Sequence, residues 1–170
     1  MHEPLEVPER MVEFLKAPAA LGLEVITATD VGIGPILAVH DFGYVAFLKH
    51  GYDDWMAIEE DLGAQVQTGI FVPYDNPGIG IMAKAAKYQA DDSAPISEHS
   101  WTSIYWSAQT ALNAAEALLN DDLSDTERAE THIQLCFSRP PGHHARKSAA
   151  GGFCYLNNAC LLYTSPSPRD

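Results

Sequence analysis

The stretch Arg139-Pro140-Pro141-Gly142-His143-His144-Ala145 decides the fold class of this chain and places its candidate site. Only Ser138 separates it from residues 133–137 (Ile-Gln-Leu-Cys-Phe), an apolar run typical of a buried strand. Two prolines and a glycine predict a rigid turn at the end of that strand. Ligands of layered α/β domains bind at the carboxyl ends of strands, so this turn is the first place to look for chemistry.

Two adjacent histidines, His143 and His144, stand on the turn. Neighbouring side chains in a turn are expected to point in different directions, which makes them a poorer metal-ligand pair than histidines one helical turn apart. They suit two separate acid–base roles around one reacting group. The alternative is one hydrogen-bonded loop histidine beside one exposed histidine. The strand and the Pro-Pro-Gly turn around them favour the catalytic interpretation.

A second segment follows at residues 151–158, Gly-Gly-Phe-Cys-Tyr-Leu-Asn-Asn. The glycine pair allows the backbone to approach a ligand closely. Cys154 lies beside this site, and a Cys–His nucleophile is the alternative to a packing role. We favour packing for Cys154, and we expect Cys136 on the predicted strand to be a small core residue.

The remaining pattern alternates helices with strands. Helical spacing predicts a helix opening at residues 8–15, short helices at 44–50 and 83–88, and a long helix at 101–119 capped by Ser100. The β-branched residues at 23–27 predict a short strand. Together these elements predict an α/β layered domain with a mostly parallel sheet.

Composition excludes several classes of protein. The 170 residues suffice for one domain, and 10 Lys+Arg against 23 Asp+Glu give a net charge of −13. An acidic chain is a poor ligand for nucleic acid or for an anionic membrane surface, but it suits a cationic substrate or partner. Three cysteines without close spacing predict neither a disulfide framework nor a zinc ribbon, and we expect a cytoplasmic protein.

Residues 139–145 and 152–158 closely resemble the histone deacetylase family, above all its bacterial acetylpolyamine amidohydrolases and histone-deacetylase-like amidohydrolases. Weaker similarities lie at residues 6–10, 39–48 and 96–101, so the resemblance covers most of residues 4–159. It implies the arginase–deacetylase α/β fold, a mostly parallel sheet with flanking helices, incomplete in this chain.

The resemblance also implies a reaction, the zinc-dependent removal of acetyl groups from acetyl-lysine or acetylpolyamines. By position, His144 would be the general base and His143 its electrostatic partner. Gly152 would offer its backbone near the substrate amide, and Phe153 would form one wall of the channel. The Zn²⁺ ligands of the family, two aspartates and a histidine, lie downstream of the matched segments, so no metal ligand is assigned in this chain.

The tail at residues 160–170 (Cys-Leu-Leu-Tyr-Thr-Ser-Pro-Ser-Pro-Arg-Asp) breaks the preceding pattern. One reading frame of a transposon-type sequencing adapter encodes all of it. We therefore interpret residues 1–159 as the N-terminal part of a histone-deacetylase-like domain and 160–170 as non-native. The chain by itself is expected to be inactive and to bind no zinc tightly. The alternative is a disordered polar tail that belongs to the protein.

Other functions stay open at this point. One is a non-catalytic protein that binds acyl-lysine or polyamine through the same pocket, and another is an arginase-type metal hydrolase. Asp91 and Asp92 lie in the loop where polyamine-specific members attract a cation, although paired acids are more often a solvated loop. The expected partner is an acetylated amine, with a homo-oligomer left open for the full-length protein.

Overall fold

The computed structural model describes residues 7–72, 78–119 and 133–164. Helices dominate these residues and lie, in chain order, at α1 (Glu9–Leu21), α2 (Gly34–Val39), α3 (Phe42–Met56), α4 (Ile81–Tyr88), α5 (Ser100–Leu119) and α7 (Asn158–Thr164). In this part of the chain, no helix is both long enough and apolar enough to cross a membrane.

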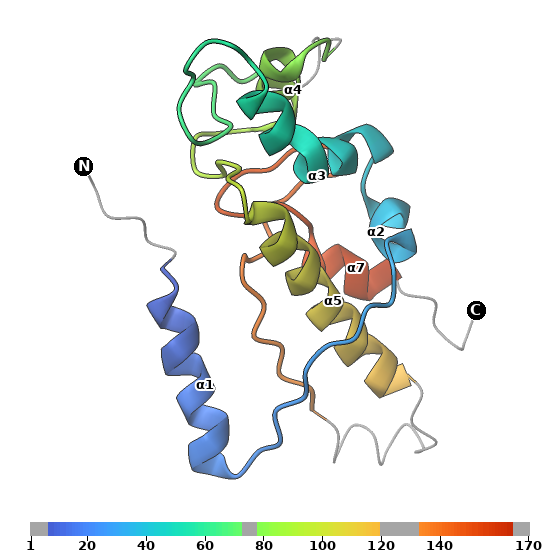
Figure 1. The fold of residues 1–170 in the computed structure, drawn as a ribbon. Coiled ribbons are helices and arrows are strands. Elements are labelled where there is room, and N and C mark those ends of the chain that lie inside the picture. Colours follow the sequence, from blue (N-terminus) through green and yellow to red (C-terminus); the bar gives the residue numbers. More distant parts are fainter. Residues whose placement is uncertain (1–6, 73–77, 120–132, 165–170) are drawn as a thin grey trace.

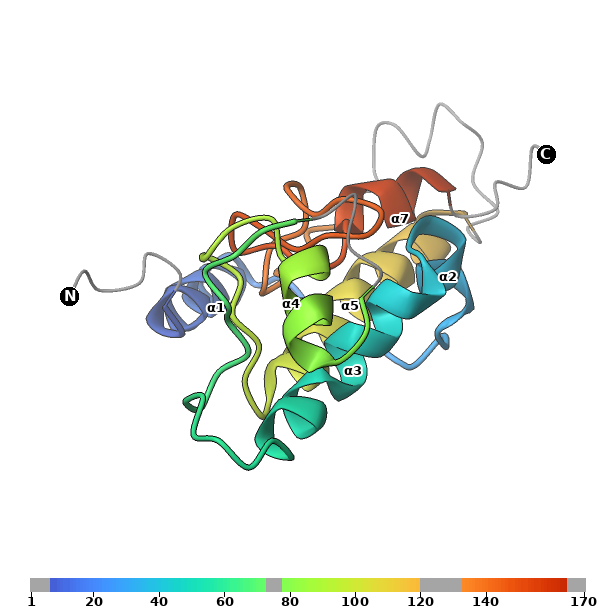
Figure 2. The same ribbon diagram turned by 90° about the horizontal axis from the view of Figure 1, so that it is seen from above.

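The long helix α5 is the centre of the packed region (Figure 1). α7 and α3 pack against α5, α2 packs on α7 and α4 packs on α3. Figure 2 shows α5 between α7 and α3. Ile104, Ala108 and Leu112 are buried at four-residue spacing on α5 and meet Tyr44 and Leu48 of α3 in one core.

All four predicted helices are confirmed. α1, α3 and α4 extend past the predicted residues 8–15, 44–50 and 83–88, and α5 matches residues 101–119 to within one residue. Ser100 is the first residue of α5 rather than the residue before it, and its hydroxyl oxygen accepts a hydrogen bond from the Ser97 amide at 2.9 Å. Helices are predicted well because their hydrogen bonds are local.

The two predicted strands are wrong for the described residues. Residues 23–27 and 133–137 have no regular secondary structure, and the described backbone pairs only in isolated bridges such as Val66–Ile96. A strand needs a neighbouring strand to satisfy its backbone groups. Without one, the Ile133 and Leu135 side chains are 82% and 66% exposed, and Cys136 is exposed rather than part of the core.

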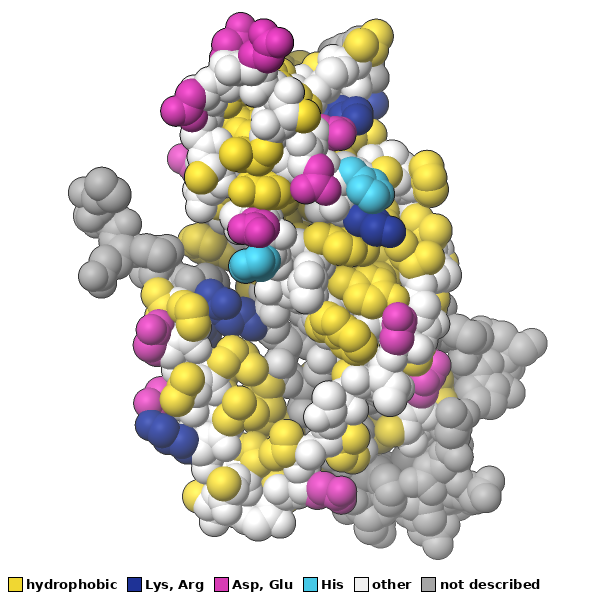
Figure 3. Space-filling model, in the orientation of Figure 1, with side chains coloured by type: hydrophobic (Ala, Val, Ile, Leu, Met, Phe, Trp, Pro, Cys, Tyr) yellow, Lys and Arg dark blue, Asp and Glu magenta, His cyan; other side chains and the backbone are white. Residues whose placement is uncertain are grey.

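Helix α1 lies apart from the other helices (Figure 1). Its Phe14 ring stacks on Phe137 with 5.9 Å between ring centroids. Val12 and Leu15 remain 59% and 46% exposed, and Figure 3 shows apolar side chains gathered over α1 and the segment after it. An exposed apolar patch of this kind favours association and low solubility.

Helix α7 includes the first residues of the predicted non-native tail. It continues to Thr164, and Leu161 is buried in the core. Residues 165–170 lie outside the described residues. The interpretation of residues 160–170 as non-native therefore stays a prediction.

Candidate active site

The turn that carries the two histidines is held by Ser107 of α5. The Ser107 hydroxyl donates to the Pro140 carbonyl at 2.7 Å and accepts from the Asn158 side-chain amide at 3.0 Å. The Ser107 carbonyl accepts from the Ser138 hydroxyl at 3.1 Å. One buried side chain thus joins α5, the turn and the start of α7.

Gly142 lies where the turn meets the backbone before α7. A Cβ atom on Gly142 would stand 2.5 Å from both the Asn158 nitrogen and the Leu156 oxygen. Both atoms belong to the backbone, so neither can move aside as a flexible side chain would. The position therefore requires glycine for space alone.

His143 and His144 leave this turn with exposed side chains. Their ring centroids lie 4.2 Å apart with 51° between the ring planes. The rings are thus in contact, and the expectation that they point in different directions is wrong. Two imidazoles side by side can serve one reacting group, one as proton acceptor and the other as charge partner.

Gly152 faces the His144 ring. A Cβ atom on Gly152 would come within 2.8 Å of His144 Cδ2. Gly152 has φ 56° and Phe153 has φ 64°, so two consecutive residues adopt the left-handed conformation. The structure therefore brings three of the predicted site residues, His143, His144 and Gly152, into one cluster, with Phe153 next to it in the chain.

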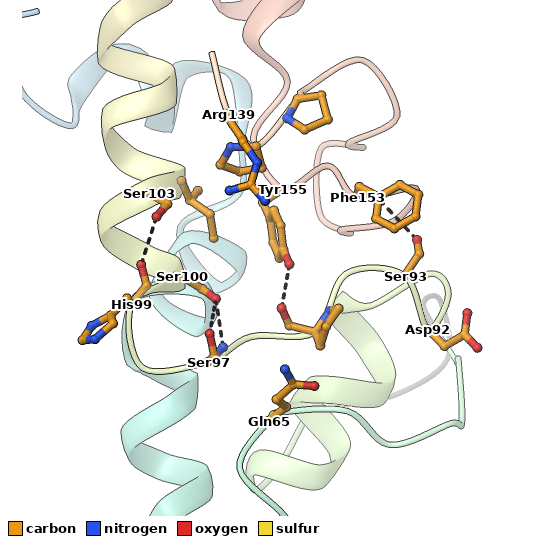
Figure 4. Close-up of a pocket in the computed structure, with 14 residues that line it drawn as sticks. Gln65, Asp92, Ser93, Ser97, His99, Ser100, Ser103, Arg139, Phe153 and Tyr155 are labelled. Carbon is orange, nitrogen blue, oxygen red and sulfur yellow. Dashed lines mark hydrogen bonds between the residues drawn. The ribbon is translucent and has the colours of Figure 1, made fainter. Parts of the chain in front are cut away.

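Phe153 also lines a cavity of 430 Å³ (Figure 4). Tyr155 and the turn residues Arg139, Pro140 and Pro141 form another part of its wall, and the Tyr155 hydroxyl donates to the Pro95 carbonyl at 2.6 Å. Neither histidine is among the described residues that line the cavity. The cavity and the histidine pair are therefore neighbours that share the Phe153 segment.

Comparison with known proteins places this cluster in a family. A family profile described as "Histone deacetylase domain" matches residues 4–165, nearly the whole chain. The chain belongs to the histone deacetylase family. It is 47% identical over 161 residues to an acetylpolyamine amidohydrolase of Burkholderia pseudomallei, covering 95% of this chain and 45% of that protein. It is 37% identical to acetylpolyamine amidohydrolase 1 of Pseudomonas aeruginosa, covering 92% of this chain and 44% of the relative.

A solved structure assigns the fold of this family member. The crystal structure of an acetylpolyamine aminohydrolase from Burkholderia pseudomallei matches with a TM-score of 0.85 and 44% identity, covering 95% of this chain and 45% of that one. The predicted arginase–deacetylase α/β fold is therefore confirmed, and the described residues form a helix-rich part of it. The chain spans about half the length of the curated relatives it matches.

The buried His40 ring connects Lys147, just after the histidine turn, with Asn157 in the second site segment. It is 1% exposed, its Nε2 accepts from the Asn157 amide at 2.9 Å, and its Nδ1 lies 3.1 Å from the Lys147 carbonyl. Since Nε2 accepts, Nδ1 carries the proton and donates it, which defines a neutral ring. Burial lowers the pKa of His40 and outweighs the nearby carbonyls and Asp41, which favour the charged form.

The neutral His40 ring predicts acid sensitivity. The pKa of His40 is lowered from 6.5 in the folded chain. Just below pH 6.5, His40 therefore binds a proton in the unfolded chain but not in the folded chain. The contribution of neutral His40 to stability is fully present above pH 6.5. Below that pH the free energy of unfolding should fall by up to ~1.4 kcal/mol per pH unit, until the pKa of His40 in the folded chain is reached. Urea unfolding of this chain between pH 7.5 and 5 measures the slope. His40→Gln should flatten it, and equal slopes in both proteins would refute the assignment.

The described residues do not fit a metal ion. Within residues 7–72, 78–119 and 133–164, no three His, Cys, Asp or Glu side chains lie close enough together to hold one.

Two contributors to the site were missed by sequence reasoning. His40 bonds to both Lys147 and Asn157, a role that the sequence analysis does not assign to it. The sequence allows Asp91 to be either an acid that attracts a cation or a solvated loop residue, yet Asp91 is half-buried and accepts a hydrogen bond from the Gly152 amide. No local pattern reveals either role, because the partners lie 117 and 61 residues away in sequence. Cys154 is 0% exposed, in agreement with a packing role.

Proposed function

We propose that the whole protein is a zinc-dependent deacetylase that hydrolyses the acetamide of an acetylated amine. One observation carries the proposal. The rings of His143 and His144 lie in contact, 4.2 Å apart, with Gly152 closely packed against His144, in a chain that matches the histone deacetylase domain. The zinc ligands would come from outside the described residues, and this chain by itself would be inactive.

His144 would take the proton from the attacking water and pass it to the nitrogen of the leaving amine. The water oxygen bonds to the acetyl carbon, the C–N bond breaks, and acetate and the free amine leave. His143, whose ring touches that of His144, would balance the charge that develops. The Gly152 backbone would lie along the substrate amide, and the Phe153 ring would pack on the aliphatic stem.

Acetylpolyamines are the favoured substrates over acetyl-lysine. The relatives that match most of the chain are named acetylpolyamine amidohydrolases. The net charge of −13 also favours a polycationic substrate and product. A peptide carrying acetyl-lysine is the competing substrate of the same chemistry.

Acetate release by the full-length protein tests the proposal. Zinc-loaded protein should release acetate from a monoacetylated diamine faster than from an acetyl-lysine peptide. Removing the metal with a chelator should lower the rate at least about 100-fold, and added Zn²⁺ should restore it. Calorimetric binding of the acetylated diamine without acetate release would instead identify a binding protein. Hydrolysis that survives the chelator would exclude the metal-dependent mechanism.

A further inference from the structure

A carboxylate and a hydroxyl of one loop hold the segment opposite His144. Asp91 Oδ2 accepts a hydrogen bond from the Gly152 amide at 2.9 Å. The Ser93 hydroxyl oxygen accepts one from the Phe153 amide at 3.2 Å, shown as a dashed line in Figure 4. Two consecutive amides of the site are thus anchored by side chains about 60 residues earlier in the sequence.

Asp91 and Ser93 are also hydrogen-bonded to each other. Asp91 Oδ1 accepts from the Ser93 hydroxyl at 2.5 Å and from the Ser93 amide at 2.9 Å. Burial opposes ionisation, but these hydrogen bonds and the one from Gly152 outweigh it and hold the pKa of Asp91 below its ordinary value. The ionised carboxylate has protein donors on both oxygens. Its neighbour Asp92 is exposed and points away from Phe153 (Figure 4).

The backbone of Gly152 and Phe153 adopts a conformation that its surroundings must hold in place. Phe153 adopts φ 64°, a conformation that a residue with a Cβ keeps only when its surroundings hold it. Gly152 stands so close to the His144 ring that a single added carbon would collide with it. A shift of either residue would therefore change the space beside His144 and the direction of the Phe153 ring.

We propose that Asp91 and Ser93 are positioning residues that hold the Gly152 backbone and the Phe153 ring in register with His144 for amide hydrolysis. This inference rests on the proposed function. It gives Asp91 a part in aligning the substrate through Gly152 rather than in attracting a cation, because both of its oxygens are occupied by protein donors.

Amide hydrogen exchange, followed by NMR on this chain, tests the anchoring without any activity. Asp91→Ala should accelerate exchange at Gly152 about five- to tenfold, and Ser93→Ala should do the same at Phe153. The Cys154 amide is the internal reference, because it bonds to the Gly151 carbonyl at 3.0 Å within the segment itself. Asp53→Ala, which removes an exposed carboxylate of α3, is the matched control and should change none of the three.

The pattern of exchange decides the first step. If all three amides accelerate together in Asp91→Ala, the carboxylate supports the fold in general and the inference is overturned. If Asp91→Ala does not fold, Ser93→Ala carries the same test, because it removes only the acceptor of the Phe153 amide.

Kinetics of the zinc-loaded full-length protein test the second step. Asp91→Ala should lower kcat/KM for the acetylated diamine about tenfold to hundredfold. Asp91→Asn, which keeps one acceptor for Gly152, should recover part of the loss. Unchanged kinetics alongside altered exchange would overturn the positioning role. An inactive wild-type protein would defeat the proposed function, and the role in hydrolysis with it, while leaving the exchange result as a separate finding on the anchor.

Discussion

Replacing His144 with alanine is expected to lower kcat of the full-length protein about 10²–10⁴-fold, the loss typical for removal of a general base. KM should change little, because the His144 side chain is proposed to act on the water and the leaving nitrogen. Stability should stay within ~0.5 kcal/mol of wild type, since the ring is exposed and its removal leaves no cavity. Steady-state acetate release and urea unfolding of the same preparation measure both quantities.

His50→Ala is the matched control, because His50 is an exposed histidine at a distance in sequence, on α3. It should leave both kcat and stability unchanged. A His144→Ala enzyme that keeps more than about a tenth of wild-type kcat would show that another group takes the proton. In that case the contact between the two rings makes His143 the next residue to replace.

Gly142→Ala is expected to cause the largest loss of stability, about 3 kcal/mol. The added methyl group would overlap two backbone atoms at 2.5 Å, the Asn158 nitrogen and the Leu156 oxygen. Relief of the overlap requires the turn and the start of α7 to move apart, so the loss of stability should lie at the upper end of the 1–3 kcal/mol typical of an overpacked site. Urea unfolding of this chain gives the number, and the exchange of the Asn158 amide shows whether the damage is local.

Gly34→Ala is the control for the glycine substitution. Gly34 lies in α2, and apart from its chain neighbours no atom lies within 4 Å of an added Cβ. Alanine there should change the free energy of unfolding by no more than ~1 kcal/mol, because the lower entropy of the unfolded chain offsets the crowding of a Cβ before Pro35. If Gly142→Ala lowers the free energy of unfolding no more than Gly34→Ala does, the prediction is wrong. The turn could then move away from the backbone of residues 156 and 158 at little cost.

Prediction from the sequence succeeded where the interactions are local. The spacing of Ile104, Ala108 and Leu112 identified α5, and those residues are buried as expected. The turn at residues 139–145 was also identified, because prolines, glycine and histidines in that order carry a specific meaning. The strands at 23–27 and 133–137 failed, because a strand is stabilised by partners that no local pattern supplies.

The catalytic and binding roles of the candidate site residues stay a prediction. The structure brings His143, His144 and Gly152 into one cluster, while the anchors Asp91 and His40 emerge only from the folded chain. Asp91 and His40 bind backbone amides or carbonyls, which do not depend on the residue type. The sequence therefore does not indicate which residue each of them binds. Charge pairs and apolar stripes can be recognised in a sequence, and contacts of this kind cannot.

The His40 ring bridges positions separated by 107 and 117 residues along the chain. Contacts of such long separation form late, because the chain must lose the entropy of a large loop before they reward it. During translation at about 5–20 residues per second, Asn157 follows His40 by roughly 6 to 23 seconds. The His40 ring therefore lacks its Asn157 partner through that interval. His40 can join the loop at Lys147 to the segment at Asn157 only after residue 157 has been synthesised.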